Sequence, residues 1–146
     1  MSDPEKARDG TTATWAYYPT YGITGFCGVV FPIPHILDSS QIDPGTYGFD
    51  GYNNIKNITI ELYGKKNWVP ANSTDGVLLG SLSFTGGNGV TRIITPNDTK
   101  TAFKSVWFRV TTDGGGVSVI GEMRFYGIEL PTGESAIFPS DGFGHM

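Results

Sequence analysis

The chain has 146 residues, among them 21 glycines and 9 prolines, and carries a net charge of −4. This length corresponds to one ordinary domain, with enough chain to bury a core. The ten basic residues are scattered, whereas binding a phosphate backbone requires several Lys or Arg on one face, so nucleic acid is not expected as a partner. No apolar run approaches the roughly 20 residues of a membrane helix, and residues 1–10 do not resemble a secretion signal. We therefore expect synthesis in a cytoplasm and no membrane partner.

The distribution of glycine and proline predicts the fold class. No segment of a dozen residues keeps the apolar period of a helix, while short alternating segments recur about every ten residues. This pattern predicts an all-β domain, an antiparallel β-sandwich or jelly roll, over residues 21–130. Residues 1–20 are expected to form an N-terminal arm, and residues 131–146 a C-terminal tail.

The first expected strand is the apolar segment of residues 26–33. It contains Cys27, the single cysteine, which is expected to be a small buried side chain without a disulfide. His35 follows Pro34, and we expect it to be partly buried and hydrogen-bonded rather than catalytic.

Residues 49–54 gather several oxygen-bearing side chains around Gly51. Asp, Gly and Asn are typical of a tight turn before a strand, and this is the favoured interpretation. The same composition is also found in loops that bind hard cations, so calcium is kept as the alternative.

Residues 58–63 alternate between the two faces of a strand that is buried on one side only. The aliphatic residues share one face and the others share the opposite face; the two sets are Ile58, Ile60 and Leu62, and Thr59, Glu61 and Tyr63. Gly64 is expected to end this strand. Two further strands are predicted at residues 77–84 and 90–95, the second after a glycine-rich turn.

Two more alternating strands are predicted at residues 106–111 and 117–126, with a break at Ile120 and Gly121 that permits a bulge. Trp107 is expected on the face opposite the core, packed under a loop or a neighbouring subunit. The residues predicted to share one interior are Ile58, Ile60, Leu62, Val106, Phe108, Val110, Met123 and Phe125.

The sequence offers no constellation typical of catalysis. Nucleophilic catalysis needs a base near Ser, Thr or Cys, yet the chain has two histidines, His35 and His145, and the second is next to the C-terminus. Zinc-binding His and Cys spacings, phosphate-binding glycine loops and the G-x-S-x-G motif are missing. We therefore predict no catalytic residues, no metal and no cofactor.

The two strands near the end of the chain resemble those of discoidin-type domains, the coagulation-factor type C, galactose-binding-like family. The residues that carry the resemblance are those of Ser105-Val106-Trp107-Phe108-Arg109-Val110 and of Val119-Ile120-Gly121-Glu122-Met123-Arg124-Phe125-Tyr126-Gly127. The strand at residues 58–64 and the following hairpin extend it, so that residues 58–127 are covered. The resemblance implies a β-sandwich whose ligand residues lie in variable loops, and it transfers none of those residues to this chain.

Two functions remain from different classes. The first is a non-catalytic assembly protein, such as a decoration, cement or tail protein of a phage or virus, located in the virion and forming a homo-oligomer or binding other virion proteins. The alternative is a carbohydrate-binding module with a glycan partner.

Each function has candidate residues. Aromatic rings that could stack on a sugar are those of Trp68, Tyr63 and Trp15. Residues predicted to contact neighbouring subunits are apolar or aromatic, and most lie in the arm and tail, where exposure would be costly. They are Tyr17, Tyr18, Trp107, Ile137 and Phe138.

Overall fold

The computed structural model describes residues 16–17, 24–45, 48–50, 57–67, 69–85, 89–113 and 119–129. Within these ranges every regular element is a β-strand, and no helix long and apolar enough to cross a membrane occurs. The strands are β1 (Ala16–Tyr17), β2 (Gly25–Asp43), β3 (Asn57–Lys65), β4 (Val77–Thr85), β5 (Arg92–Ile94), β6 (Ala102–Thr112), β7 (Val119–Ile120) and β8 (Glu122–Glu129). The predicted all-β class is confirmed.

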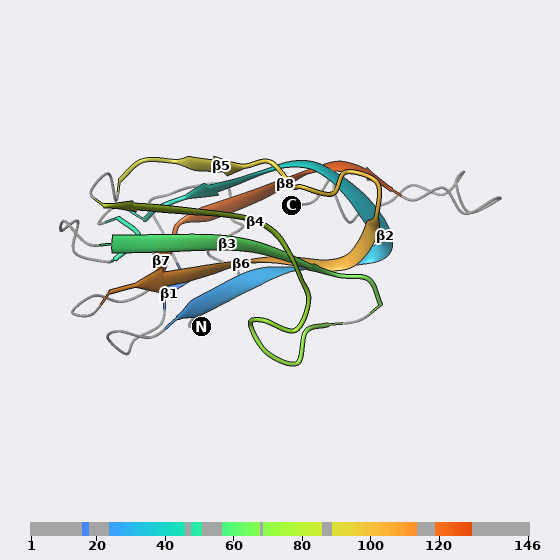
Figure 1. Cartoon of the computed structure of the whole chain (residues 1–146), viewed down its shortest axis with the longest axis horizontal. Helices are drawn as coiled ribbons and strands as arrows, with labels where there is room; N and C mark the ends of the chain where they lie inside the picture. Colours follow the sequence, from blue (N-terminus) through green and yellow to red (C-terminus); the bar gives the residue numbers. More distant parts are fainter. Residues whose placement is uncertain are drawn as a thin grey trace.

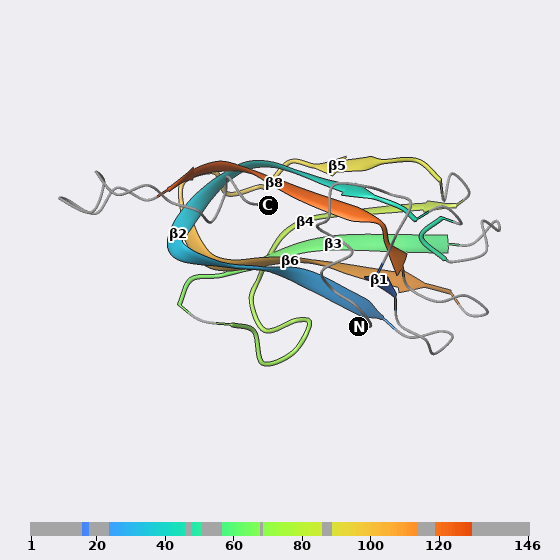
Figure 2. The ribbon, with the colours of Figure 1, turned by 180° about the vertical axis from the view of Figure 1, so that it is seen from behind.

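The strands form two layers that are connected through β2. The larger sheet has the order β4-β3-β6-β2-β5, with β8 also paired to β2, and all these pairs are antiparallel. The first half of β2 pairs mainly with β6, and its second half pairs with β5 and β8. Figures 1 and 2 show β2 running along one layer, curving at one end of the molecule and returning in the other.

The bend in β2 lies where its register shifts, between Val30 and His35. Pro32 and Pro34 have no amide hydrogen to donate to a neighbouring strand, which makes this the natural place for the strand to leave one sheet. His35 is fully buried at the bend; its Nδ1 lies 2.7 Å from the carbonyl oxygen of Ile33 and its ring 4.2 Å from that of Phe31. The expected hydrogen bond of His35 is confirmed, and the side chain is more deeply buried than the partial burial that was expected.

The hydrophobic core fills the space between the two layers. All eight residues predicted to share the interior belong to it, and each is at most 2 % exposed. The rings of Phe108 in β6 and Phe125 in β8 stack across the core at a centroid distance of 5.1 Å. Cys27 belongs to the same core, as expected. The predicted strand parity is therefore confirmed.

Most strand boundaries differ from the sequence-based expectation; β5 is shorter and β6 longer than predicted, and three other differences have a clear physical reason. β2 continues through the bend to Asp43, because its second half has new partners in β5 and β8. β3 continues through Gly64 to Lys65, because both residues still pair with β6. Gly121 interrupts the last predicted strand, since its amide donates to the Asp43 carbonyl and a Cβ there would lie 2.2 Å from the Pro44 carbonyl oxygen.

The predicted arm, tail and calcium loop are described only in part. Ala16 and Tyr17 of the arm form β1, which pairs with β7. Phe49 and Asp50 are fully buried, and the Phe49 carbonyl accepts a hydrogen bond from the amide of Val119. The rest of the arm, residues 51–56 and the tail lie outside the described residues, so calcium binding stays an open alternative there.

Truncation of Phe108 to Ala tests the core. The side chain is fully buried and stacked on Phe125, so its loss should lower the free energy of unfolding by about 3–5 kcal/mol in chemical denaturation. Ile93→Ala is the control, because Ile93 is 61 % exposed and its truncation should cost less than about 1 kcal/mol. Equal effects of the two substitutions would contradict the assigned strand faces.

Candidate functional site

One surface of the larger sheet points away from the core and is formed by β3, β6 and the first half of β2; we call it the outer face. Antiparallel register places side chains of neighbouring strands in rows across it. One row joins Tyr63, Trp107 and Gly28, and the next joins Lys65, Ser105 and Val30. The row with the rings of Tyr63 and Trp107 therefore lies next to the last row in which β3 pairs with β6.

Trp107 lies at the centre of the first row and is 2 % exposed. Its ring stacks on that of Tyr63, with centroids 5.7 Å apart and an interplanar angle of 8°. On its other side is Gly28, where a Cβ would lie 2.4 Å from the Trp107 Cβ and 2.0 Å from the Val106 carbonyl oxygen. Glycine is thus the residue that lets β2 approach the base of the indole.

The loop between β3 and β4 covers the indole. We call residues 69–76 the covering loop; Figure 1 shows it on the outer side of the sheet, next to β6 and the first half of β2. The Trp107 Nε1–H donates a hydrogen bond of 2.9 Å to the carbonyl oxygen of Ser73. At Gly76 a Cβ would lie 2.6 Å from the Trp107 ring, so the loop passes close over it.

Asp75 fastens the covering loop to the sheet. Its Oδ2 accepts a hydrogen bond of 2.8 Å from the amide of Ala71 and lies 2.5 Å from the Nζ of Lys65 in β3. The hydrogen bond from Ala71 and the Lys65 ammonium hold the pKa of Asp75 below its ordinary value of 3.8. The charged form of this side chain is therefore the one that closes the loop.

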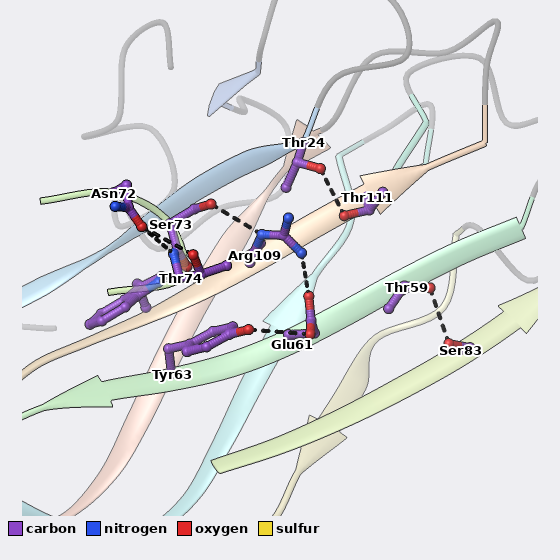
Figure 3. A network of polar contacts seen from close by, with 11 residues as sticks. Thr24, Thr59, Glu61, Tyr63, Asn72, Ser73, Thr74, Ser83, Arg109 and Thr111 are labelled. Carbon is purple, nitrogen blue, oxygen red and sulfur yellow. Dashed lines mark hydrogen bonds and ion pairs between the residues drawn. The ribbon is translucent and has the colours of Figure 1, made fainter. Parts of the chain in front are cut away.

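A second anchor is the polar network drawn in Figure 3. Arg109 bridges the sheet and the loop: its Nη1 lies 2.6 Å from Glu61 Oε1, and its Nε donates to Ser73 Oγ at 3.1 Å. The Tyr63 hydroxyl donates to the same carboxylate at 3.4 Å. Burial, followed by the negative charge of Glu61, raises the pKa of Tyr63 above its ordinary value of 10. These contacts hold the rings of the aromatic row in one arrangement.

Between the covering loop and the outer face lies a pocket of about 240 Å³. Trp107 lines it together with residues of β2, β6 and the loop; the others are Phe26, Cys27, Gly28, Val29, Val30, Pro70, Ser105 and Val106. The lining is almost entirely apolar. Val30 is half exposed, and Val69, next to Pro70, is 44 % exposed, so apolar surface continues from the pocket to the solvent.

The aromatic residues singled out from the sequence differ in where the structure places them. Trp107, expected to pack under a loop or a neighbouring subunit, lies under the covering loop of its own chain. Tyr63 is 8 % exposed and its ring stacks on that of Trp107; its contact with a sugar stays a prediction. Trp68 and Trp15 lie outside the described residues; Trp68 is next to Val69 in the chain.

The predicted subunit contacts are not tested. Tyr18, Ile137 and Phe138 lie outside the described residues, and for Tyr17 the structure gives only its place in β1.

Sequence reasoning missed most of the residues that line the pocket. Phe26, Gly28 and Val30 form the alternate face of β2, and this signal was present in the sequence as a period of two. Ser105 and Pro70 could not be connected with that face without the strand register and the loop path.

The described residues contain no group of three or more His, Cys, Asp or Glu that could hold a metal ion.

Comparison with known proteins places the fold. No protein-family model and no curated protein sequence matches the chain. Among solved structures, it is similar to the family 62 carbohydrate-binding module of Clostridium thermocellum Xyl5A, with a TM-score of 0.61, 22 % identity, and coverage of 87 % of this chain and 84 % of that chain. The family 32 module of C. perfringens NanJ, in complex with galactose, has a TM-score of 0.61 and 18 % identity, covering 84 % and 82 %.

A third similar structure is an F5/8 type C domain from Bacteroides fragilis, with a TM-score of 0.58, 16 % identity, and coverage of 87 % of this chain and 82 % of that chain. These likenesses establish that the chain has the discoidin-like, galactose-binding-like β-sandwich fold. The family resemblance drawn from residues 58–127 is confirmed at the level of the fold.

Replacement of Asp75 by Asn should loosen the covering loop, because the amide keeps the shape and loses the charge that holds Lys65. Solvent exchange of the Trp107 indole hydrogen, followed by NMR, should become faster while the fold is retained. Wild-type protein should show the same change as the pH falls below 3.8 through the lowered pKa, because the contribution of a carboxylate with a depressed pKa is lost on protonation. Unchanged exchange in the variant would show that Asp75 does not fasten the loop.

Proposed function

We propose that this chain is a non-catalytic carbohydrate-binding domain and that it holds a saccharide in the pocket between the covering loop and the outer face. The observation that carries the proposal is the pocket itself, which is lined by the aromatic residues Phe26 and Trp107, by aliphatic residues and by Ser105. Such a combination is what a sugar ring requires, since its C–H face packs on apolar surface while its hydroxyl groups need hydrogen-bond partners.

The size of the pocket limits the ligand to a small unit. A volume of about 240 Å³ is below the roughly 300–1,000 Å³ of sites for drug-sized molecules. The pocket therefore suits one sugar residue, with the remainder of a chain extending over the exposed surface of Val30 and Val69. The anchored loop and the stacked row preorganise this site, which reduces the entropy lost on binding.

The comparisons support a carbohydrate-binding domain over the virion hypothesis. Two of the similar structures described above are carbohydrate-binding modules, one of them with galactose bound, and another similar structure is a pectin-binding module. None of them is a phage or virus protein. Placement in a virion and homo-oligomer formation through the arm and tail stay predictions from the sequence.

A pair of valines tests the location of the site. Val30→Asn places a polar amide at the edge of the pocket, and Val90→Asn is a matched control because the two side chains are 50 % and 51 % exposed and Val90 does not line the pocket. For a saccharide identified on a glycan array, isothermal titration should give an affinity about fivefold weaker for Val30→Asn, the loss of about one apolar contact. The control should bind like wild type.

Trp68→Ala is expected to weaken the same binding further without unfolding the protein, because Trp68 precedes Val69 and Pro70 in the chain that forms the pocket wall. The absence of any bound saccharide on the array would overturn the proposed function. Binding that both valine variants retain in full would move the site to another surface.

A further inference from the structure

A lysine adjacent to the pocket lining has no carboxylate partner among the residues that the structure describes. Lys104 precedes Ser105, which lines the pocket, and its Nζ donates a hydrogen bond of 2.8 Å to the carbonyl oxygen of Pro32. Pro32 is two residues beyond Val30, which lines the pocket, so the lysine contacts β2 close in the chain to the pocket lining. The ammonium group is thus held against the part of β2 that follows the pocket lining.

The charge of Lys104 remains available to a ligand. A carbonyl oxygen is a neutral partner, and among the described residues Lys104 makes no ion pair. The neighbouring lysine of the outer face, Lys65, differs in this respect because Asp75 neutralises it. Lys66, exposed next to Lys65, lies near Asp98, whose pKa it helps to lower. Around the pocket, Lys104 is therefore the cation with no carboxylate partner among the described residues.

From this arrangement we infer that the preferred ligand is an anionic saccharide, with a carboxylate or sulfate group that binds the Lys104 ammonium while its ring lies in the pocket. The inference rests on the proposed function and narrows it to a class of sugar. The whole chain has a net charge of −4, which by itself disfavours an anionic ligand. The positive charge of Lys104 has the opposite sign and favours such a ligand locally.

The expected gain is moderate. Lys104 is partly exposed, and an ion pair in contact with water is weakened by solvent and salt. A charge-assisted hydrogen bond is stronger than a neutral one, because one partner is ionised. The contact with Pro32 already restricts the side-chain conformations of Lys104, so less conformational entropy is lost when an anion binds. We expect about a five- to tenfold preference for a charged saccharide over its neutral equivalent at low salt.

Four trisaccharides provide the probes: trigalacturonate, its fully methyl-esterified form, a sulfated trisaccharide of galactan and the neutral trisaccharide of galactan. Esterification removes the carboxylate charge and keeps the sugar ring. Wild-type protein should bind trigalacturonate or the sulfated sugar about five- to tenfold more tightly than the ester or the neutral galactan, and added salt should reduce this difference. The better of the two charged probes identifies the anionic group.

Lys104→Gln and Arg124→Gln distinguish a local from a general effect of charge. Both remove one positive charge, but Arg124 is exposed on β8, in the other layer. Lys104→Gln should abolish the preference for the charged sugar and leave binding of the neutral one unchanged, while Arg124→Gln should behave like wild type. Melting temperatures should stay close to that of the wild-type protein.

Equal affinity for charged and neutral sugars, or equal effects of Lys104→Gln and Arg124→Gln, would overturn the inference and leave the proposed function intact. Failure of all four trisaccharides and of a general glycan array to bind would overturn both.

Discussion

The arrangement of the outer face depends on the burial of one indole, that of Trp107. Its three neighbours meet three requirements: Tyr63 supplies a stacked ring, Gly28 allows close approach of the next strand, and Ser73 accepts the indole N–H. A buried N–H without an acceptor would cost about 1–3 kcal/mol, so the covering loop must return to the sheet for the tryptophan to be accommodated. The pocket is the space that remains beside the indole once the loop has closed.

The same strands connect this site to the hydrophobic core. In β6 the side chains alternate, so that Phe108 packs in the core while Trp107 and Arg109 form the outer face. In β2, Cys27 and Val29 belong to the core cluster and also line the pocket, next to the outward-facing Gly28 and Val30. A change in the core is therefore expected to alter the pocket through the shared strands.

Local patterns in the sequence were sufficient to predict the fold, but they were not sufficient to predict the site. The alternation in β3, β6 and β8 predicted the buried face correctly, because the period of two depends on nearest neighbours along the chain. The hydrogen bond of Trp107 to Ser73 and the contact of Lys104 with Pro32 join residues 34 and 72 positions apart. Such contacts depend on the strand register and on the path of a loop, which local periodicity does not contain. The bend in β2 could be related to Pro32 and Pro34 once the partners of its second half were known.

The central claim is that a saccharide binds between the covering loop and the outer face, and an NMR titration of isotopically labelled protein tests it most directly. Addition of the tightest-binding trisaccharide should shift the indole N–H resonance of Trp107 and the backbone amides of residues 26–30 and 105–107. Shifts confined to Arg124, Tyr126 and their neighbours, on the exposed surface of the other layer, would contradict the account.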